Sequence, residues 1–409
     1  MSDRPIEPPA TIGILGGGQL GRMLGFAARA MGYRVVVLDP DPSCPAAAIA
    51  DRVIVATYDD VEAARGLVGS TDVVTYELED VALEVVDALE AFVPVRPGPH
   101  PLRVSGDRIS ERRFVESSGA RVAPWREVRT RADLGAAAEA LGTPLRLKSA
   151  RGGYDGRSQV RIGSLVELEG ALERLGRPAG TTVLAERELE FTAELSVIVA
   201  RSTSGHTATF PPVRNVHDAG ILVESVAPAP VDGTVVEAAT GIGLRLAIAM
   251  DLVGTLTVEL FLLPDGSLVV NELAPRVHNS GHWTMEGAAT SQFEQHIRAI
   301  CGLPLGSTEL HSSAAATVNL LGSGPDRPAR LRGVGTALAD SAVHLHVYDK
   351  RRVFERRKMG HLTALGSSVD EALERARMAR AALVWDDGSA GGDEVDQVPQ
   401  ATSATEPTT

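Results

Sequence analysis

Residues 268–283 gather side chains that bind ligands and exchange protons. An apolar run leads to an amide and a carboxylate, and a loop with a guanidinium and two imidazoles follows at once. The side chains are Asn271, Glu272, Arg276, His278, Asn279 and His282. This density of hydrogen-bonding and titratable groups predicts a ligand site. The alternative is a polar loop whose side chains cap the neighbouring backbone.

A second carboxylate precedes this stretch. Residues 255–263 alternate in the manner of a β-strand, Pro-Asp-Gly-Ser at 264–267 favours a turn, and 268–273 forms the returning strand. If the turn centres on residues 265 and 266, Glu259 faces Glu272. Opposed side chains lie about 4.5–5.5 Å apart, so two carboxylates there require a cation or a shared proton. Mg²⁺ carrying a polyphosphate fits, whereas a bulge at Gly266 would send one carboxylate to the other face.

Two further segments favour phosphate binding. A glycine-rich loop at 150–158 lies between a strand ending at Lys148 and one beginning at Gln159, and its amides could surround a phosphate chain. Basic residues cluster at 348–352 and 356–361, which favours a phosphate seat. The alternatives are a mobile hairpin tip for the first segment and a solvated basic face for the second. A helix is expected over residues 165–175.

The first part of the chain reads as alternating strands and helices, which predicts a parallel sheet. A strand at 11–15, a glycine turn at 16–21, a helix and a second strand ending at Asp39 fit a dinucleotide-binding unit. A mononucleotide or a sugar phosphate would suit the same turn, and tight packing alone would also explain the glycines. Glu77 follows the strand at 73–75, where it is either a ribose contact or a solvated acid.

Bulk properties narrow the function classes. A chain of 409 residues predicts two or three domains, and a net charge of −13 argues against general nucleic-acid binding. Cys44 and Cys301 match neither a metal spacing nor a disulfide framework, which indicates reduced thiols in the cytoplasm. The sequence shows neither a signal peptide nor a membrane span. The expected segments are a disordered lead (1–10), a first domain (11–105), a linker helix and lid (106–192), a larger domain (193–386) and a disordered tail (387–409).

Together these motifs resemble the 5-(carboxyamino)imidazole ribonucleotide synthase family of ATP-grasp enzymes. The resemblance runs from Thr11 to about Trp385. It is carried by Gly-Gly-Gly-Gln-Leu-Gly-Arg-Met-Leu at 16–24, Gly-Gly-Tyr-Asp-Gly-Arg at 152–157, Asn-Glu-Leu-Ala-Pro-Arg-Val-His-Asn-Ser-Gly-His-Trp at 271–283 and Tyr-Asp-Lys at 348–350. It implies an α/β and α+β fold: a Rossmann-like pre-ATP-grasp domain, a small lid and a C-terminal domain. Ser158 departs from the glycine usual in the family, and Ser tolerates positive φ poorly.

The resemblance also implies roles for individual residues. Arg108 and Lys148 would contact the ATP phosphates, and Glu259 and Glu272 would hold Mg²⁺, or Mn²⁺ in its place. The remaining ATP contacts would be Gly153, Tyr154, Asp155, Gly156, Arg157, Ser158 and Gln159 in the lid loop, Glu186, Arg187, Glu188 and Leu189 at the adenine edge, and Glu194, His217 and Asn271. Tyr154, Asp155, Arg157, Arg276 and His278 would serve the chemistry. The ribonucleotide would lie against Gln19, Leu20, Glu77, Lys350, Arg357 and Lys358.

The implied reaction joins bicarbonate to the exocyclic amine of 5-aminoimidazole ribonucleotide through carboxyphosphate, and it converts ATP to ADP and phosphate. Such an enzyme would have no nucleic-acid or membrane partner and would commonly be a homodimer. The alternative in the same class is a formate-dependent glycinamide ribonucleotide transformylase. A nicotinamide-dependent dehydrogenase would leave the carboxylate hairpin and the basic clusters without a role. A non-catalytic ATP-binding module would not require Glu259, Glu272 and Arg276.

Overall fold

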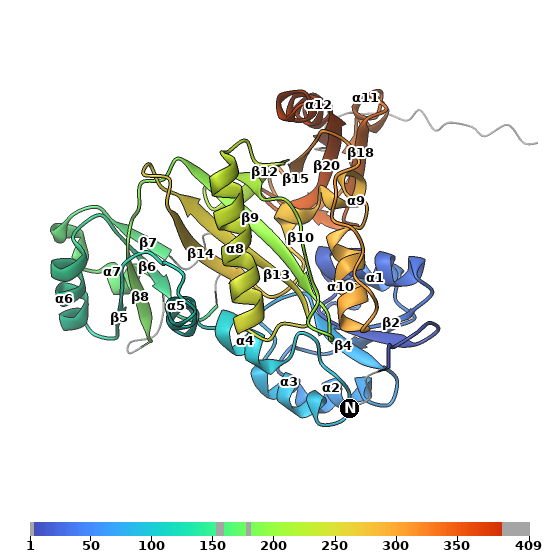
Figure 1. Ribbon diagram of the computed structural model, residues 1–409, viewed down its shortest axis with the longest axis horizontal. Coiled ribbons are helices and arrows are strands. Elements are labelled where there is room, and N and C mark those ends of the chain that lie inside the picture. The colour runs from blue at the N-terminus through green and yellow to red at the C-terminus, as the bar shows by residue number, and fades with distance from the viewer. Residues whose placement is uncertain (1–3, 153–158, 177–180, 387–409) are drawn as a thin grey trace, which may run out of the picture.

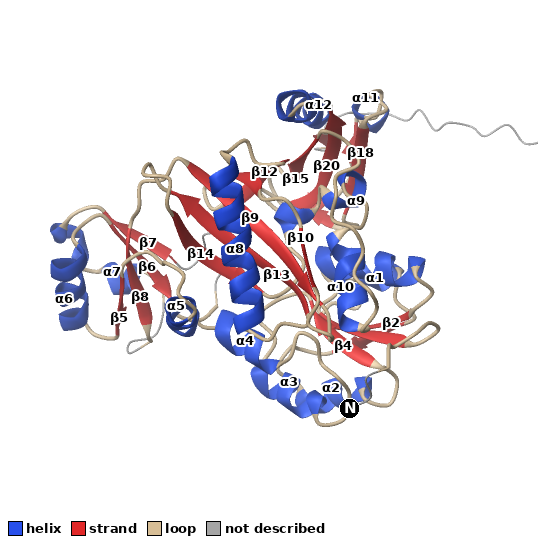
Figure 2. Cartoon of the chain, viewed as in Figure 1, coloured by secondary structure: helices blue, strands red, loops and turns tan. Residues whose placement is uncertain are grey.

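The computed structural model describes residues 4–152, 159–176 and 181–386. It contains a parallel four-stranded sheet, an antiparallel four-stranded sheet and a nine-stranded sheet between them (Figure 1). Figure 2 shows the two smaller sheets at opposite sides of the large one, each carrying its own helices. No helix among the described residues is both long enough and apolar enough to cross a membrane.

The first domain is built on parallel strands in the order β3-β2-β1-β4. Its strands are nearly continuous runs of Val, Ile and Leu, as a sheet covered on both faces requires. Its elements are β1 (Thr11–Leu15), α1 (Gln19–Ala30), β2 (Arg34–Asp39), β3 (Arg52–Val55), α2 (Val61–Ala64), β4 (Val73–Tyr76), α3 (Leu83–Glu90) and α4 (Pro99–Ser105), with 3₁₀ turns at Pro45–Ala48 and Arg65–Leu67.

The lead segment differs from the expectation of disorder over its described part, residues 4–10. Ile6 donates its backbone N–H to the carbonyl of Cys301 over 2.8 Å, and its own carbonyl accepts from the Tyr33 hydroxyl over 2.7 Å. Ile6 also packs against the core that α1 shares with the helix ending at Ile300. Apolar packing and hydrogen bonds thus hold a segment whose proline-rich composition gave no sign of it.

The lid is an antiparallel sheet in the order β5-β8-β6-β7, preceded by the helix α5. The helix expected over residues 165–175 is broken into a 3₁₀ turn and a short helix, because Gly170 adopts a left-handed conformation with φ +69°. The elements are α5 (Arg108–Ser117), β5 (Trp125–Val128), α6 (Arg131–Leu141), β6 (Leu145–Ser149), β7 (Gln159–Ile162), the 3₁₀ turn Leu165–Leu168, α7 (Ala171–Arg174) and β8 (Val183–Arg187).

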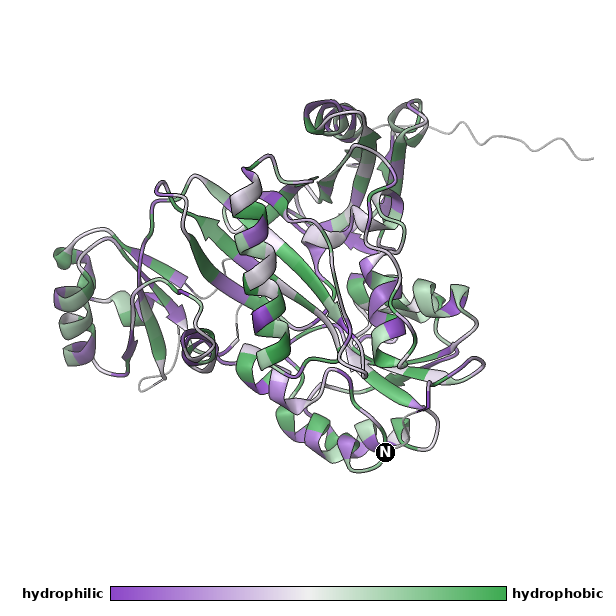
Figure 3. Ribbon diagram, in the orientation of Figure 1, coloured by the Kyte–Doolittle hydropathy of each residue, from purple (hydrophilic) through white to green (hydrophobic). Residues whose placement is uncertain are grey.

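The nine-stranded sheet has the order β14-β13-β9-β11-β12-β15-β20-β18, with β10 beside β9. One long helix, α8, covers the face of β9 and β13, and Figure 3 shows those strands as mainly hydrophobic where the helix crosses them. The elements of this half are β9 (Ala193–Arg201), β10 (Thr207–Thr209), β11 (Val213–Asp218), β12 (Ile221–Ala227), α8 (Gly233–Ala249), β13 (Gly254–Leu262) and β14 (Leu268–Ala274).

After β14 the chain forms a helical segment and then adds further strands to the same sheet. The described residues from 193 onward are therefore built around one sheet. Helix α12 packs on β15 and β20 (Figure 1). The elements are the 3₁₀ turn Asn279–Gly281, α9 (Thr284–Gly287), α10 (Gln292–Ile300), β15 (Ala314–Leu321), β16 (Arg327–Pro328), β17 (Leu331–Arg332), α11 (Val334–Ala337), β18 (Val343–Val347), β19 (Arg352–Val353), β20 (Lys358–Gly366), α12 (Val369–Ala381) and β21 (Val384–Trp385).

Candidate active site

Glu259 and Glu272 lie directly opposite each other on β13 and β14, as the sequence predicts. The route to this register is not the predicted one. Near the turn Leu262 pairs with Leu268, which is one residue out of step with a turn centred on 265 and 266. Farther along the hairpin, a register shift between Glu259 and Leu260 inserts one extra residue on β14. This bulge restores the pairing of the two carboxylates.

The extra residue also turns Asn271 toward the carboxylates. Val270 and Leu273 both pack in the core under α8, although strict alternation would place residues three apart on opposite faces. The two residues between them therefore share the other face of the sheet. There the Asn271 amide donates to the Glu259 carboxylate over 3.2 Å. The bulge thus assembles an amide and two carboxylates on the face away from α8.

The electrostatics of this face leave a position for a cation. Burial and then the charge of Glu272 raise the pKa of Glu259 to about 7. His278 places Nε2 3.5 Å from the Glu259 carboxylate, and burial together with the Arg276 charge lowers the pKa of His278 well below its ordinary value. Its Nδ1 accepts from the Ser280 amide over 3.3 Å, so the neutral ring carries its proton on Nε2.

A divalent cation would satisfy both carboxylates. The described residues contain no cluster of three or more His, Cys, Asp or Glu side chains arranged to hold a metal on their own. Two carboxylates and an amide oxygen suit Mg²⁺, which takes few protein ligands and leaves its other positions to water and phosphate. A site designed to hold the ion by protein alone, such as structural zinc, would need a full set of ligands.

A buried network of charges connects the lid with this hairpin. Lys148 on β6 lies 2.7 Å from Glu186 on β8, and Arg112 on α5 lies 2.9 Å from the same carboxylate. Arg112 also pairs with Glu111, which accepts the backbone N–H of Leu273 on β14 over 2.9 Å. Burial opposes ionisation of Glu186, but the charges of Arg112 and Lys148 prevail and lower its pKa to about 2.

Sequence reasoning missed Arg112 and Glu111, because an ordinary-looking helix gives no sign that these residues face inward. Arg108, which was expected to contact phosphate, begins the same helix, and its charge acts on Glu111. Gln159 on β7 pairs with Lys148 across the lid sheet. Lys148 and Gln159 are therefore neighbours on the lid sheet. Arg108 begins α5, the helix that links the lid to the carboxylate hairpin.

The hinge residues divide into two groups. Glu188 binds Arg146 and Arg161, each over 2.6 Å, which accounts for a basic residue placed within an otherwise apolar strand. The Arg187 side chain turns to the end of α6, where it donates to the Leu141 carbonyl. Glu186 and Glu188 are therefore engaged by cations, and the backbone N–H of Glu188 already donates to the Pro144 carbonyl.

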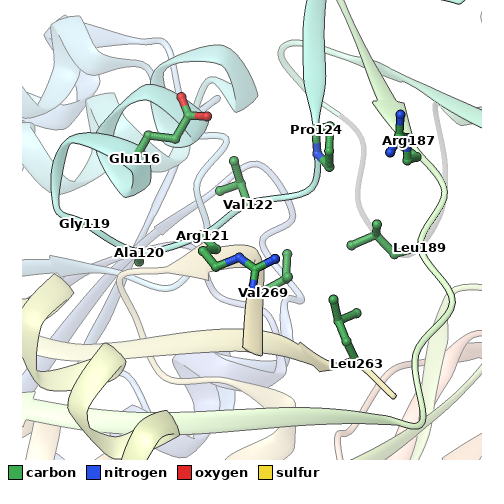
Figure 4. A pocket seen from close by; sticks show the side chains of 10 residues that line it. All are labelled: Glu116, Gly119, Ala120, Arg121, Val122, Pro124, Arg187, Leu189, Leu263 and Val269. Carbon is green, nitrogen blue, oxygen red and sulfur yellow. The ribbon is translucent and has the colours of Figure 1, made fainter. Parts of the chain in front are cut away.

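A cavity of about 720 Å³ adjoins the hinge. Figure 4 shows apolar side chains of the linker before β5, the hinge and the end of the carboxylate hairpin around it, among them Val122, Leu189 and Leu263. Glu259, Glu272 and Lys148 do not line it. Glu116, Arg121 and Arg187 complete the lining, so the hinge borders a space of mixed character that is distinct from the carboxylate pair.

Two further residues expected to contact ATP also meet. His217 on β11 places Nδ1 2.6 Å from the Glu194 carboxylate on β9. Burial alone would lower the pKa of His217, but the contact with Glu194 and the charge of Glu259 raise it. The effect of Glu259 shows that this pair lies close to the carboxylate hairpin.

Arg276 pairs with a residue of the first domain. Its Nε lies 2.8 Å from a carboxylate oxygen of Glu79, which follows β4. Burial opposes the charge of Arg276, but Glu79 outweighs burial and raises its pKa. The guanidinium therefore stays charged, and it joins the loop after β14 to the C-terminal edge of the parallel sheet. Sequence reasoning gave Glu79 no role.

The glycine turn of the first domain is occupied by carboxylates of the chain itself. Glu77 accepts the amides of Gly18 and Gly21 over 2.5 Å each, and Asp39 accepts the amide of Gly17 over 2.7 Å. These are the N–H groups at the start of α1 that a dinucleotide pyrophosphate would need. The hypothesis of a nicotinamide dinucleotide at this turn is therefore disfavoured by the geometry, and Glu77 is a buried cap of α1.

Residues expected to hold the substrate phosphate come from the last strands. The Lys350 ammonium donates to the Lys358 carbonyl over 2.8 Å, and the positive charge of Lys358 acts on His217 and His278. Arg357 instead donates to the Arg352 carbonyl and lies over the Phe354 ring, on the outer side. Lys350 and Lys358 are thus associated with the site, whereas the Arg357 side chain is engaged elsewhere.

Two groups of predicted residues need separate statements. Gln19 and Leu20 begin α1, and Leu20 is buried in the core beside Tyr348. The lid-loop residues Gly153, Tyr154, Asp155, Gly156, Arg157 and Ser158 lie outside the described residues. The roles predicted for them stay predictions.

The comparisons with known proteins show the family. Family models match a ribonucleotide synthetase preATP-grasp domain at residues 9–106, an ATP-grasp domain at 113–293 and a phosphoribosylaminoimidazole carboxylase C-terminal domain at 315–375. The N5-carboxyaminoimidazole ribonucleotide synthase of Brucella melitensis is 44% identical over 365 residues, covering 89% of this chain and 99% of the relative. The chain belongs to the N5-carboxyaminoimidazole ribonucleotide synthase family.

Solved structures of this synthase family have the same fold. An ADP complex of an N5-carboxyaminoimidazole ribonucleotide synthetase superposes with a TM-score of 0.84 at 40% identity and covers 92% of this chain and 97% of the other. The Aspergillus clavatus synthase in complex with ADP and 5-aminoimidazole ribonucleotide has a TM-score of 0.83 at 32% identity, with 91% and 98% covered. The ATP-grasp ligase fold of the synthase family therefore extends over nearly the whole chain.

Proposed function

We propose that this protein carboxylates the exocyclic amine of 5-aminoimidazole ribonucleotide with bicarbonate and ATP, and releases ADP and phosphate. The observation that carries the proposal is the carboxylate pair Glu259 and Glu272 beside the loop bearing Arg276 and His278. Family membership supports the reaction class, because a relative has been solved with ADP and 5-aminoimidazole ribonucleotide. Bicarbonate, the metal and the individual roles below are parts of the proposal.

ATP lies between the lid and the nine-stranded sheet. Lys148 and Arg108 contact its phosphates, and the pairing of Lys148 with Glu186 aims the ammonium at them before ATP arrives. The backbone of residues 186–189 receives the adenine edge, for which the cavity at Leu189 is adjacent support. Glu194 accepts from the ribose hydroxyls, and His217 holds that carboxylate in place.

Glu259 and Glu272, with Asn271, hold the Mg²⁺ that accompanies ATP, and Mn²⁺ has the same preference for oxygen ligands. When bound, the ion neutralises charge that develops on the phosphate oxygens during phosphoryl transfer. The chain contributes the geometry: the bulge at Asn271 fixes both carboxylates on one face, and His278 reaches one of them from the following loop.

The second half of the site acts on bicarbonate. A bicarbonate oxygen attacks the γ-phosphorus, the bond to ADP breaks, and the amine then attacks the carbon of carboxyphosphate and expels phosphate. Arg276 keeps its charge because of Glu79 and stabilises the carboxyphosphate anion. The neutral His278 ring donates a hydrogen bond from Nε2. Carboxyphosphate must be kept from water, and the lid loop at 153–158, with Tyr154, Asp155 and Arg157, serves this purpose.

The ribonucleotide enters from the other side of Arg276. Lys350 and Lys358 bind its phosphate and Gln19 lies at its ribose, whereas Glu77 remains the cap of α1. Arg357 would need to leave its present partners in order to contribute. We also propose a homodimer located in the cytoplasm. The family resemblance alone supports both points, and sedimentation velocity on the purified chain tests the first.

Formate-dependent glycinamide ribonucleotide transformylase is the alternative within the same chemistry. ADP release distinguishes the two. With 5-aminoimidazole ribonucleotide present, added bicarbonate should stimulate ADP release, and ¹³C-bicarbonate should label the carbamate product. If formate and glycinamide ribonucleotide stimulate ADP release instead, the proposed reaction is wrong. Bicarbonate removed by degassing and then restored is the matched control.

A further inference from the structure

Three histidine rings form a stack that includes His282, from the loop that also bears Arg276 and His278. His361 on β20 stacks on His346 of β18 at 4.6 Å between ring centroids and on His282 at 4.5 Å, with interplanar angles of 20° and 28°. His282 and His361 are fully buried. Near-parallel rings direct their nitrogen lone pairs side by side, so the stack does not converge on a metal. The proposed reaction gives it no chemical step.

The stack joins two segments that carry different parts of the proposed site. His282 belongs to the loop that also bears Arg276 and His278, and it packs on Phe293 of α10. His361 is on the strand that begins with Lys358, and its Nδ1 is hydrogen-bonded to the Tyr348 hydroxyl over 2.9 Å. The loop that bears Arg276 and His278 (the carboxylation loop) therefore meets the strand that begins with Lys358 through the stacked rings of His282 and His361.

Tyr348 connects His361 with the turn that carries Lys350. Its backbone N–H donates to the Met359 carbonyl on β20, and Asp349 then adopts a left-handed conformation with φ +59°. Asp tolerates that conformation better than most residues. The turn brings the Lys350 ammonium back to the Lys358 carbonyl, 5.8 Å from the centre of the Tyr348 ring. Through the Tyr348 hydroxyl, and through the contact of the two rings at 5.7 Å between centroids, His361 can hold this turn.

A second contact fixes the outer end of the stack. His346 places Nε2 2.6 Å from the Glu286 carboxylate on α9, which follows the carboxylation loop directly. The α9 segment and β18 are therefore linked by a hydrogen bond as well as by the rings. By contrast, His282 has no hydrogen-bond partner for either ring nitrogen within the described part of the chain. Its ring contributes through packing and not through polar contacts.

We propose that His361 is a positioning residue that holds Lys350 at a set distance from Arg276 and His278 through Tyr348 on one side and His282 on the other. The inference rests on the proposed function, in which Lys350 binds the phosphate of the imidazole ribonucleotide. The distance matters because the phosphate anchors the ribonucleotide at one end while its amine must meet the carboxylating intermediate at the other. Lys350, at one end of this connection, has no proposed contact with ATP.

Two substitutions test the connection from both sides. His361→Phe keeps a stacking ring and loses Nδ1, and Tyr348→Phe loses only the hydroxyl. Each should raise the KM for 5-aminoimidazole ribonucleotide by about 3- to 10-fold, the equivalent of one hydrogen bond, and leave the KM for ATP unchanged. The double variant should be no worse than the more severe single variant, because both remove the same contact. His344→Phe, on β18 but outside the stack, is the matched control.

Lys350→Gln separates the inference from the proposed function. If Lys350→Gln leaves the KM for the ribonucleotide unchanged, the phosphate seat is wrong and the inference falls with it. If Lys350→Gln raises that KM but both stack variants leave it unchanged, the seat stands and the positioning role is overturned. An equal rise in the KM for ATP would also overturn it, because that result indicates general loosening. Tyr348→Phe retains the test if thermal unfolding shows that His361→Phe does not fold.

Discussion

The Glu77 carboxylate at the end of β4 accepts the backbone N–H of Gly21 in the first turn of α1, over 2.5 Å. Its other oxygen accepts from Gly18, and α1 has no capping side chain of its own. A helix start leaves several N–H groups without intrahelical partners. Here one carboxylate from a neighbouring strand satisfies two of them and neutralises the positive end of the helix. A side chain at position 21 would meet the Gly16 carbonyl at 2.4 Å.

Replacing this carboxylate should therefore destabilise the first domain. Glu77→Ala leaves two N–H groups without their acceptor, and we expect the free energy of unfolding to fall by about 1–3 kcal/mol in urea titrations. Glu84→Ala, at an exposed position of α3, should change it by less than about 0.5 kcal/mol. Tight binding of a nicotinamide dinucleotide to the unmodified protein would contradict the assignment of this turn as already occupied.

The carboxylate pair should exchange stability for function. Glu272→Gln is expected to abolish Mg²⁺-dependent ATP turnover. Without metal it should raise the melting temperature, because it removes the repulsion between two like charges on facing residues. Added Mg²⁺ and ATP should raise the melting temperature of the unmodified protein more than that of the variant. Glu237→Gln, at an exposed position of α8, should match the unmodified protein in both measurements. Normal turnover by Glu272→Gln would refute the metal assignment.

Lys148 and Arg112 share the Glu186 carboxylate but should differ in role. Arg112 is 1% exposed, so Arg112→Met leaves a buried carboxylate with less compensation and should lower the free energy of unfolding by about 3–5 kcal/mol. Lys148→Met should have a smaller effect on stability and raise the KM for ATP at least about 10-fold, equivalent to about 1.4 kcal/mol. Urea unfolding and ADP-release kinetics on both variants measure the difference. Equal effects on the KM for ATP would assign both residues to the network alone.

His296 links the first domain to the central sheet and should make stability depend on pH. Its Nδ1 accepts from the Thr255 amide over 3.2 Å, and its Nε2 lies 2.8 Å from the Thr75 hydroxyl. Burial lowers the pKa of His296 to about 3, so the unfolded chain binds this proton first as the pH falls below about 6.5. The contribution of neutral His296 is complete above that pH and is lost on acidification, with a slope of up to about 1.4 kcal/mol per pH unit.

Urea unfolding at pH 7, 6 and 5 checks this prediction. His296→Asn should be less stable at pH 7, because it loses the paired contacts, but its free energy of unfolding should fall less steeply with pH. His206→Asn, at an exposed position, should keep the slope of the unmodified protein. The other buried histidines contribute to the same acid sensitivity, so the slope should be reduced and not abolished. An unchanged slope in His296→Asn would show that His296 is not one of the groups responsible.

Local sequence determined the elements and much of the candidate site. Alternating apolar residues around a Pro-Asp-Gly-Ser turn specify a hairpin, and the glycine turn specifies a β–α junction, because both signals depend on neighbours along the chain. The motif at 271–283 and its resemblance to a family placed ATP, Mg²⁺ and the ribonucleotide in one region. The relatives confirm the family, the fold and the reaction class.

Long-range contacts decided the rest, since a sequence does not show which distant side chain will occupy a buried donor. Glu77 caps α1 from another strand, Arg112 reaches Glu186 from a separate helix, and Arg276 finds Glu79 across a domain boundary. None of these partners lies within a local motif. Each pairing arises because buried charges and amides must be satisfied by whatever the folded chain brings near.

The pair Glu259 and Glu272 shows both contributions, that of local sequence and that of tertiary packing. Sequence symmetry about the turn predicted that the two carboxylates face each other, and they do. The turn itself is one residue out of step, and the fold corrects this at Asn271 because Leu273 and Val270 must both reach the core under α8. The sequence thus determined which two acids would meet. Only core packing decided the bulge that lets them meet on one face, with Asn271 beside them.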